Sequence, residues 1–330
     1  MQISGGVQLS GGVNLVPGGS SPSPSGASPF QGSNFGYIMG GYTNPAPSTT
    51  TNDILKYSYA SDGNASQSGD LMQDTRMAGG GNSSSTNGYM AGARTGPTAL
   101  SNKIEKFPFA SDGNTTSSAN VANGGSKYTG FSSSTDGYAY GGEIGPNGAN
   151  MLKTDKFSFA SDSDSTDLGS LNSDRGSGGC TSSDSGFLMG GRSPSLVYLS
   201  DIRKFAFASD TTLSDHSDLN TATNNNAGVN SDTSGYSIAA NADGGPYTHS
   251  NIDKFPFASQ TTATEVGEVD EITYGICASS STQSGYTAGG NRSSGGPSIK
   301  IRKFPFASDG DSTDVGNLEY NTGDGASAQY

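Results

Sequence analysis

The chain has 330 residues, of which 50 are glycine and none is tryptophan, and its formal net charge is −13. Leu, Ile, Val and Phe together make up less than a fifth of the chain, a composition typical of disorder unless internal repetition indicates otherwise. The acidic balance argues against nucleic acid as a partner, no apolar run is long enough for membrane insertion, and two histidines and two cysteines are too few for a His-based metal centre or a disulfide framework.

The first 33 residues differ in composition from the rest. Residues 1–16 contain two similar runs, ISGGVQL and SGGVNLV, and residues 17–33 form a linker rich in Pro, Gly and Ser. The apolar residues of the two runs alternate with polar residues, as they do in a β-strand: Val7, Leu9, Val13 and Leu15. We expect residues 1–16 to be a strand-forming anchor that pairs with a partner protein by β-augmentation, and the alternative is a disordered tail.

A lysine-centred segment, in forms such as IEKFPFAS and IRKFPFAS, recurs six times between residues 34 and 330. Its lysines are spaced 48 to 50 residues apart: Lys56, Lys106, Lys156, Lys204, Lys254 and Lys303. So regular a period indicates one structural unit copied in series. In five copies two phenylalanines stand at alternate positions, on one face of a strand: Phe107 and Phe109, Phe157 and Phe159, Phe205 and Phe207, Phe255 and Phe257, and Phe304 and Phe306. We expect these rings to supply most of the core.

A second segment precedes each lysine segment; it has the form GYxxGG in three copies and the variants GYMAGA, GFLMGG and GYSIAA in the others. Its aromatic residues are Tyr37, Tyr89, Tyr138, Phe187, Tyr236 and Tyr286. A short run such as STDVGNL follows the lysine segment, and a run rich in Gly and Ser precedes the aromatic one. Four short runs per repeat, separated by turn residues, are typical of a four-stranded antiparallel propeller blade. We therefore predict an all-β fold, with a six-bladed β-propeller over residues 34–330.

The order of these segments resembles that of Kelch repeats, where an inner strand that starts with arginine precedes an aromatic-x-x-Gly-Gly strand. Arg76 precedes Tyr89 and Arg175 precedes Phe187 in this way, although the tryptophan of the fourth Kelch strand is missing. The combination of KFPFASDG, TDVG and GYTAGG resembles repeat proteins of marine tailed phages, cyanophages especially. This second resemblance covers about residues 34–330 and implies a virion component.

The repeat is offset at its two ends, and this offset predicts how the ring closes. Residues 34–71 supply three strands of the first blade without an inner strand, whereas the last lysine segment is followed by a tail at 319–329. The tail aligns with the inner strands of other blades, so we predict that it pairs beside residues 34–42 and closes the ring. In this alignment Gly323 occupies the position of Arg76, which leaves the first blade without one polar anchor.

The charged repeat positions have two interpretations each. The six lysines could form a ring that binds an anion or a sugar acid, or each could lie over its blade and pair with the aspartate of the following ASD, such as Asp112 or Asp309. Identical lysines in every blade favour the scaffold role. The Asp-rich turns at 161–167 and 308–314 could bind Ca²⁺, but capping of their own backbone is favoured.

The remaining reactive residues give no catalytic constellation. His216 and His249 are expected to be solvated loop residues. Cys180 and Cys277 are expected to be buried in the innermost strands of the fourth and sixth blades, too far apart for a disulfide. No Ser-His-Asp set or carboxylate pair can be placed, so we expect no enzymatic activity, no metal and no cofactor.

The phage resemblance implies a structural or attachment protein of the virion, a tail or fibre component more than a capsid decoration, present in multiple copies. It would assemble in the host cytoplasm, bind other virion proteins through residues 1–16, and present polar loops on the particle surface to a host glycan or a neighbouring protein. The alternative is a secreted lectin-like binding module unrelated to a virion.

Overall fold

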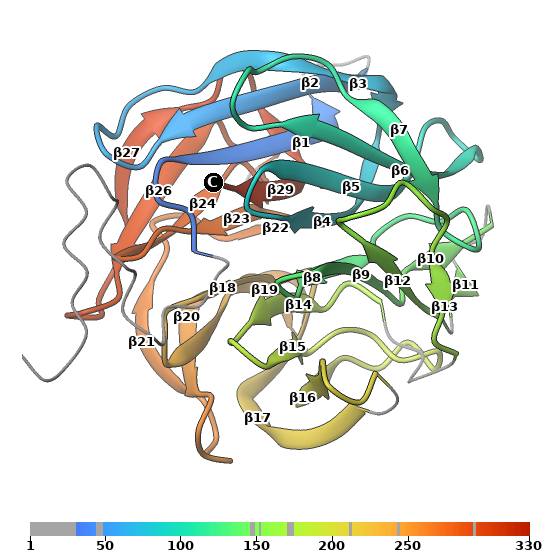
Figure 1. Ribbon diagram of the computed structural model, residues 1–330. Coiled ribbons are helices and arrows are strands. Elements are labelled where there is room, and N and C mark those ends of the chain that lie inside the picture. The colour runs from blue at the N-terminus through green and yellow to red at the C-terminus, as the bar shows by residue number, and fades with distance from the viewer. Residues whose placement is uncertain are drawn as a thin grey trace, which may run out of the picture.

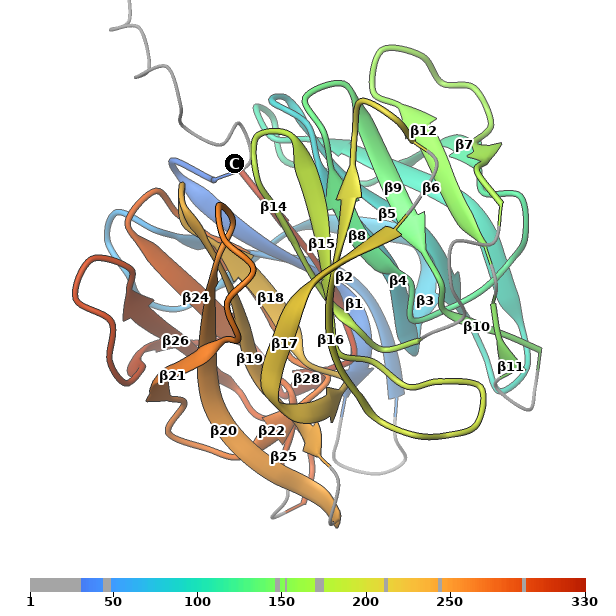
Figure 2. The ribbon, with the colours of Figure 1, turned by 90° about the horizontal axis from the view of Figure 1, so that it is seen from below.

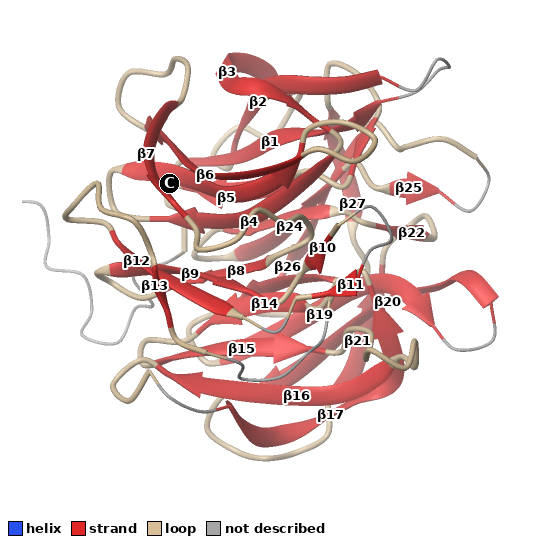
Figure 3. Cartoon of the chain, turned by 90° about the vertical axis from the view of Figure 1, so that its right-hand side faces the viewer, coloured by secondary structure: helices blue, strands red, loops and turns tan. Residues whose placement is uncertain are grey.

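The computed structural model describes residues 31–330 except 44–48, 146–148, 152, 170–174, 211–212, 243–244 and 293–294. In this part of the chain the regular elements are strands, and no helix is present that is long and apolar enough to cross a membrane (Figure 3). Antiparallel sheets follow one another around a common centre in chain order (Figure 1). The fold is the six-bladed β-propeller that the sequence predicts.

Each blade runs from an innermost strand at the axis to an outermost strand at the rim. Blade 1 comprises β28 (Thr322–Gly323), β29 (Ala326–Gln329), β1 (Phe35–Thr43), β2 (Thr49–Ser58) and β3 (Ser66–Thr75). Blade 2 comprises β4 (Met77–Ser83), β5 (Asn87–Arg94), β6 (Leu100–Pro108) and β7 (Thr116–Asn120). Blade 3 comprises β8 (Thr129–Ser132), β9 (Asp136–Tyr140), β12 (Thr154–Ser158) and β13 (Thr166–Asp167).

The other three blades repeat this order. Blade 4 comprises β14 (Gly178–Thr181), β15 (Ser185–Met189), β16 (Leu199–Ala206) and β17 (Leu213–Asn224). Blade 5 comprises β18 (Ala227–Asn230), β19 (Ser234–Ala242), β20 (Gly245–Pro256) and β21 (Thr264–Glu268). Blade 6 comprises β23 (Cys277–Ser280), β24 (Ser284–Ala288), β26 (Lys300–Pro305) and β27 (Thr313–Asn317). Two small pairs lie in the connections: β10 (Glu143–Ile144) with β11 (Ala149–Asn150), and β22 (Thr273–Tyr274) with β25 (Asn291–Arg292).

Glycine at the axis lets the innermost strands approach one another. A Cβ atom added to Gly81 would lie 2.1 Å from the carbonyl oxygen of Ser327, and one added to Gly130 would lie 2.1 Å from that of Gly81. Both distances are far below van der Waals contact, so these two positions require glycine. The paired glycines of GYxxGG have a different role, because Gly40 and Gly41 adopt φ values of 59° and 119° where β1 bulges.

The C-terminus closes the ring as the sequence predicts. Residues 326–329 of β29 pair antiparallel with residues 36–39 of β1, and β28 extends the same ladder (Figure 1). The predicted alignment is wrong by one residue, however, because the ladder places Thr322, not Gly323, at the position that Arg76 holds in blade 2. Sequence alignment alone could not resolve this, since most residues of the two short strands are small and fit in either register.

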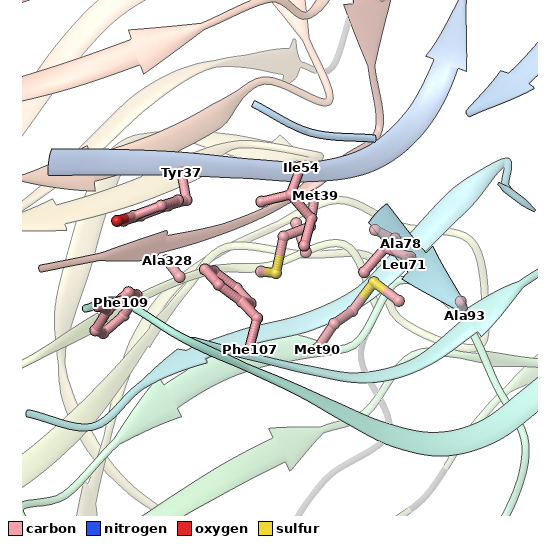
Figure 4. Close-up of a cluster of buried hydrophobic side chains, with 11 residues drawn as sticks. Tyr37, Met39, Ile54, Leu71, Ala78, Met90, Ala93, Phe107, Phe109 and Ala328 are labelled. Carbon is pink, nitrogen blue, oxygen red and sulfur yellow. The ribbon is translucent and has the colours of Figure 1, made fainter. Parts of the chain in front are cut away.

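Each interface between neighbouring blades, here called a seam, is filled by three aromatic rings. At the seam of blades 1 and 2, the ring centroid of Tyr37 lies 5.2 Å from those of Phe107 and Phe109 (Figure 4). The other seams repeat the arrangement: Tyr89 with Phe157 and Phe159, Tyr138 with Phe205 and Phe207, Phe187 with Phe255 and Phe257, Tyr236 with Phe304 and Phe306, and Tyr286 with Tyr57 and Tyr59. Such ring pairs contribute about 0.5–1.5 kcal/mol beyond apolar burial. The repeat aromatics therefore hold blade to blade.

The repeat lysines cross the same seams as ion pairs. Five of them reach the aspartate of the ASD turn in the next blade: Lys56 with Asp112, Lys106 with Asp162, Lys156 with Asp210, Lys254 with Asp309, and Lys303 with Asp62. The expected pairing of each lysine with the ASD of its own repeat is therefore wrong, because the lysine side chain crosses the seam to the turn of the next blade. The five lysines still have a scaffold role, since each ties its blade to a neighbour. Lys204 is the exception, because Gln260 replaces the aspartate in blade 5, and no salt bridge of Lys204 is seen to a described residue.

Replacing Gln260 with aspartate should supply the ion pair missing between blades 4 and 5. The corresponding pair of Lys254 and Asp309 has an N–O distance of 3.0 Å, and its side chains are about a third exposed. We therefore expect Gln260→Asp to raise the free energy of unfolding by about 0.5 kcal/mol at low salt, with the gain shrinking as salt is added. Urea denaturation of this variant beside Asp309→Gln, which should lose a similar amount, tests the expectation. A loss in Asp309→Gln without a gain in Gln260→Asp would contradict it.

The residue directly before each repeat lysine is buried in every blade, yet its chemistry differs: Leu55, Glu105, Asp155, Arg203, Asp253 and Arg302. Glu105 Oε2 accepts hydrogen bonds from the backbone of Met72 in the preceding blade, at 2.8 Å, and from Thr115. Asp155 Oδ1 likewise accepts from Ala122 N, at 3.1 Å. This position therefore fastens each of these blades to its predecessor with a different partner, which sequence reasoning missed because the residues do not repeat.

Stability should depend on pH through Asp155. Burial raises the pKa of Asp155 above its ordinary value of 3.8, against the opposing effect of hydrogen bonds from Ser165 and Ala122. Ionising the Asp155 carboxyl therefore costs more free energy in the folded state than in the unfolded state. As pH rises from about 4 to the folded-state pKa, the natural protein should lose stability relative to Asp155→Asn, and above that pKa the difference should stay constant. Urea denaturation of both proteins between pH 4 and 7 measures this difference, and a difference that is constant over the whole of this range would contradict the prediction.

Candidate functional site

The two ends of the propeller carry different connections. One end, here called the hairpin face, has the short turns that join first to second and third to fourth strands. The other, here called the loop face, has the connections from second to third strands and from blade to blade. Figure 2 shows β10, β11, β22 and β25 at the end of the blades away from the C-terminus, and these elements belong to the loop face. The second-to-third connections differ in sequence from blade to blade, as a recognition surface requires.

On the hairpin face, the last residue of each innermost strand forms a polar ring around the axis: Ser83, Ser132, Thr181, Asn230, Ser280 and Gln329. At five of six steps, the backbone N–H of one ring residue donates to the side chain of the next; Ser280 N to Gln329 Oε1 is 2.6 Å, and Gln329 N to Ser83 Oγ is 3.0 Å. These bonds join the innermost strands of neighbouring blades, so the ring binds the blades together.

The described chain begins at the rim of this ring. Gln31 Nε2 donates to the carbonyl oxygen of Asn230 in blade 5 at 3.0 Å, and Gly32 N donates to that of Ser280 in blade 6 at 2.7 Å. Residues 31–33 then lead into β1 of blade 1. Residues that precede Gln31 are therefore attached near the axis of the hairpin face. The predicted anchor residues Val7, Leu9, Val13 and Leu15 lie outside the described part of the chain.

On the loop face, a cavity of about 220 Å³ opens beside the axis between blades 1, 2 and 6. Its lining combines aromatic, cationic, amide and carboxylate side chains: Tyr42, Arg76, Met77, Tyr274, Asn291 and Asp324. Clusters of a few polar groups on an aromatic or apolar wall are typical of small-ligand sites. The tail that closes the ring also contributes Asp324 to this cavity, so the site exists only in the closed propeller.

Two charged residues of opposite sign define the cavity. The exposed guanidinium of Arg76 lies 5.9 Å from the ring centroid of Tyr42. Asp324 is held in a left-handed backbone conformation, with φ of 55°, and its Oδ2 accepts a hydrogen bond from Asn291 Nδ2 at 3.0 Å. Burial raises the pKa of Asp324, and the charges of Lys127 and Arg76 oppose that shift. The cavity thus offers a cationic donor on one side and carboxylate acceptors on the other.

A second charge cluster adjoins the cavity through Lys127. Buried Glu143 faces three cations: its Oε1 lies 2.8 Å from Arg175 Nη1 and 3.1 Å from Lys127 Nζ, and its Oε2 lies 3.7 Å from Arg94 Nη2. Three cations on one carboxylate leave excess positive charge on the loop face of a chain whose net charge is −13. The local field here is therefore opposite in sign to that of the whole protein.

None of the repeat residues predicted from the sequence lines this cavity. The lysines and repeat aromatics lie in the seams, where they hold the blades together. Arg76 was identified in the sequence only as the start of an inner strand. Tyr42, Asn291 and Asp324 occur outside the repeated motifs, and the only available signal was that the connections differ between blades.

The histidine prediction is wrong. His216 is buried in β17, its ring centroid lies 5.0 Å from that of Phe187, and its Nε2 lies 3.0 Å from the carbonyl oxygen of Pro256. His249 is half-buried in β20. Both strands are 12 residues long and run through segments whose polar composition resembles loops. Both histidines therefore lie in the long strands of blades 4 and 5, and neither lies in a loop.

The cysteines and the Asp-rich turns are placed as follows. Cys180 and Cys277 are free thiols, buried in the innermost strands of blades 4 and 6 as predicted. In the Asp-rich turns, Asp167 Oδ1 accepts from Gly169 N at 2.8 Å and Asp314 Oδ1 from Gly316 N at 3.2 Å, which is the expected capping of their own backbone. Two further aspartates cap the preceding blade instead, because Asp164 Oδ1 accepts from Asn120 N at 2.9 Å and Asp311 Oδ1 from Glu268 N at 3.0 Å. Within the described ranges, no three His, Cys, Asp or Glu side chains gather closely enough to hold a metal ion. The sequence matches no model of a protein family and no curated protein.

Proposed function

We propose that this protein is a non-enzymatic structural or attachment component of a phage virion, of the tail or fibre, mounted through residues 1–16 with its loop face directed outward. The observation that carries the proposal is the axial separation of tether and cavity. The chain enters the propeller at the hairpin-face axis, whereas the cavity of Arg76 and Asp324 opens on the loop face. A propeller tethered at one end and bearing a cavity at the other suits display on a particle surface.

The rigidity of the ring supports the same proposal. Aromatic seams, ion pairs and the strand contributed by the C-terminus tie every blade to its neighbours. A closed ring of this kind presents surface loops and leaves only short, protected strand edges at the axis. The excess positive charge around Glu143 supports a partner with acidic groups, such as a surface glycan.

Mass spectrometry of purified particles tests the proposal. We expect the chain in particles of the phage that encodes it, and we expect a variant lacking residues 1–16 to be absent from them. That variant should melt at the same temperature as the full chain, because the contacts described begin at Gln31. Incorporation of the shortened variant at the level of the full chain would contradict the mounting role. Absence of the full chain from particles would favour the lectin-like alternative.

A further inference from the structure

We infer that the loop-face cavity binds a saccharide unit that carries an acidic group, with its carboxylate or sulfate held by Arg76. The inference deepens the proposed function and rests on it only for the exposure of the loop face. It is carried by the juxtaposition, in one cavity and inside a locally positive field, of the exposed guanidinium of Arg76 with the half-buried carboxylate of Asp324 and its hydrogen-bonded partner Asn291.

The side chain of Arg76 has hydrogen-bond donors available for a ligand. Its guanidinium is exposed and lies over the ring of Tyr42, and within the described residues no hydrogen bond or salt bridge of its side chain is seen. The guanidinium is a planar fork with five N–H donors, a geometry that matches carboxylate and sulfate oxygens, and the ring of Tyr42 lies beside it. An arginine whose role was to tie blades together would have its donors occupied, as Arg302 does with Asp270 and Glu271.

Asp324 and Asn291 form a polar pair in the cavity that suits hydroxyl groups. Their side chains are hydrogen-bonded at 3.0 Å, and together they present carboxylate and amide oxygens and an amide N–H to the cavity. Vicinal hydroxyl groups of a sugar ring both donate and accept, so they match such a pair, whereas a bare anion would be repelled by Asp324. The cavity therefore favours a ligand that has hydroxyl groups as well as an acid.

The volume of the cavity and the charges around it restrict the size and charge of the ligand. About 220 Å³ is below the usual range of roughly 300–1,000 Å³ for drug-sized ligands, which favours one sugar unit over an extended chain. A chain with a net charge of −13 repels an acidic ligand at long range. Lys127, which lines the axial mouth beside Asp324, and the cations around Glu143 offset that repulsion locally.

The experiment is a calorimetric titration of the full-length chain with four probes: methyl glucuronoside, glucose 6-sulfate, methyl glucoside and inorganic sulfate. We expect saturable binding of at least one acidic saccharide, at least tenfold tighter than that of the neutral sugar or of sulfate. Arg76→Gln should weaken that binding at least tenfold. The matched control is Arg192→Gln: Arg192 also lies on the loop face, 5.8 Å from the ring centroid of Tyr198, but its Nε donates to the carbonyl oxygen of Leu196.

Each outcome bears on the inference. Binding that Arg76→Gln abolishes and Arg192→Gln preserves would support it, and coincident thermal melts would show that both variants are folded. Equal binding of inorganic sulfate would mean an anion site without saccharide recognition. Equal binding of methyl glucoside would mean that the acid plays no part. No binding of either acidic saccharide, or equal effects of the two variants, would also overturn the inference and leave virion incorporation untouched.

Discussion

A variant lacking residues 319–330 is expected to lose on the order of 5 kcal/mol of unfolding free energy, about one kcal/mol for each backbone hydrogen bond lost together with the associated burial. The deletion removes β28 and β29, which pair with β1, and it removes Tyr330, whose ring centroid lies 5.0 Å from that of Phe109 in blade 2. It also leaves the edge of β1 unpaired at the axis. Urea denaturation and thermal melting of both chains measure the loss.

Two controls identify the cause. A variant that begins at Gln31 retains the contacts described above and should melt like the full chain. A synthetic peptide of residues 319–330, added to the C-terminal deletion, should raise its melting temperature with increasing peptide concentration, because the missing strand can be supplied from outside. Equal stability of the deletion and the full chain would show that the ring is not held by its C-terminal strand.

Replacing Phe107 with alanine should cost about 3–5 kcal/mol, as expected for deletion of a buried aromatic ring. The Phe107 ring is 1 % exposed and is in contact with Tyr37 across the seam and with Phe109, which directly follows the end of β6 (Figure 4). It also covers Gly88, where an added Cβ would lie 2.4 Å from the ring. The blades cannot collapse into the space because each is held on its other side by a further aromatic seam, blade 1 by Tyr59 with Tyr286 and blade 2 by Tyr89 with Phe157. Denaturant unfolding gives the change.

The matched variant is Phe107→Leu, which keeps most of the volume and should cost about 1.5 kcal/mol or less. If packing at the seam carries the effect, the alanine variant should be clearly the less stable of the two. Similar losses in both variants would mean that the aromatic character of the ring, rather than its volume, is the main contribution.

Much of the fold follows from the sequence because each part of the repeat has a local physical reason. In GYxxGG, the first glycine leaves room for a phenylalanine ring, the aromatic residue fills a seam, and the glycine pair allows positive φ. In KFPFASD, the lysine and the aspartate belong to opposite seams. The blades share these physical requirements, so similar residues recur about every 50 positions. Strand order, blade number and the closing strand can therefore be predicted.

The candidate site could not be predicted from the repeat. Tyr42, Arg76, Asn291 and Asp324 come from three blades and are separated by up to 282 residues in the chain. Tyr42, Arg76 and Asp324 differ from the residues at the corresponding positions of the other blades, and Asn291 recurs only as Asn241 of blade 5, so no period marks the set. The buried charges before the repeat lysines, such as Asp155, escaped prediction for the same reason. Repetition reveals what all blades share, and a ligand site depends on what one blade does differently.

The two sides of each blade differ, and this bears on how the number of blades can change by gain or loss of a repeat. Every blade presents a lysine and one aromatic ring on one side, and an aromatic pair on the other, with an aspartate in all blades but the fifth. Contacts of this head-to-tail kind close into a ring only when the rotation per unit fits the circle. A tandem duplication or loss of one repeat would still leave complementary sides on each blade. Selection on blade number would therefore act through ring geometry, while the closing strand, which lies outside the duplicated repeat, would be inherited unchanged.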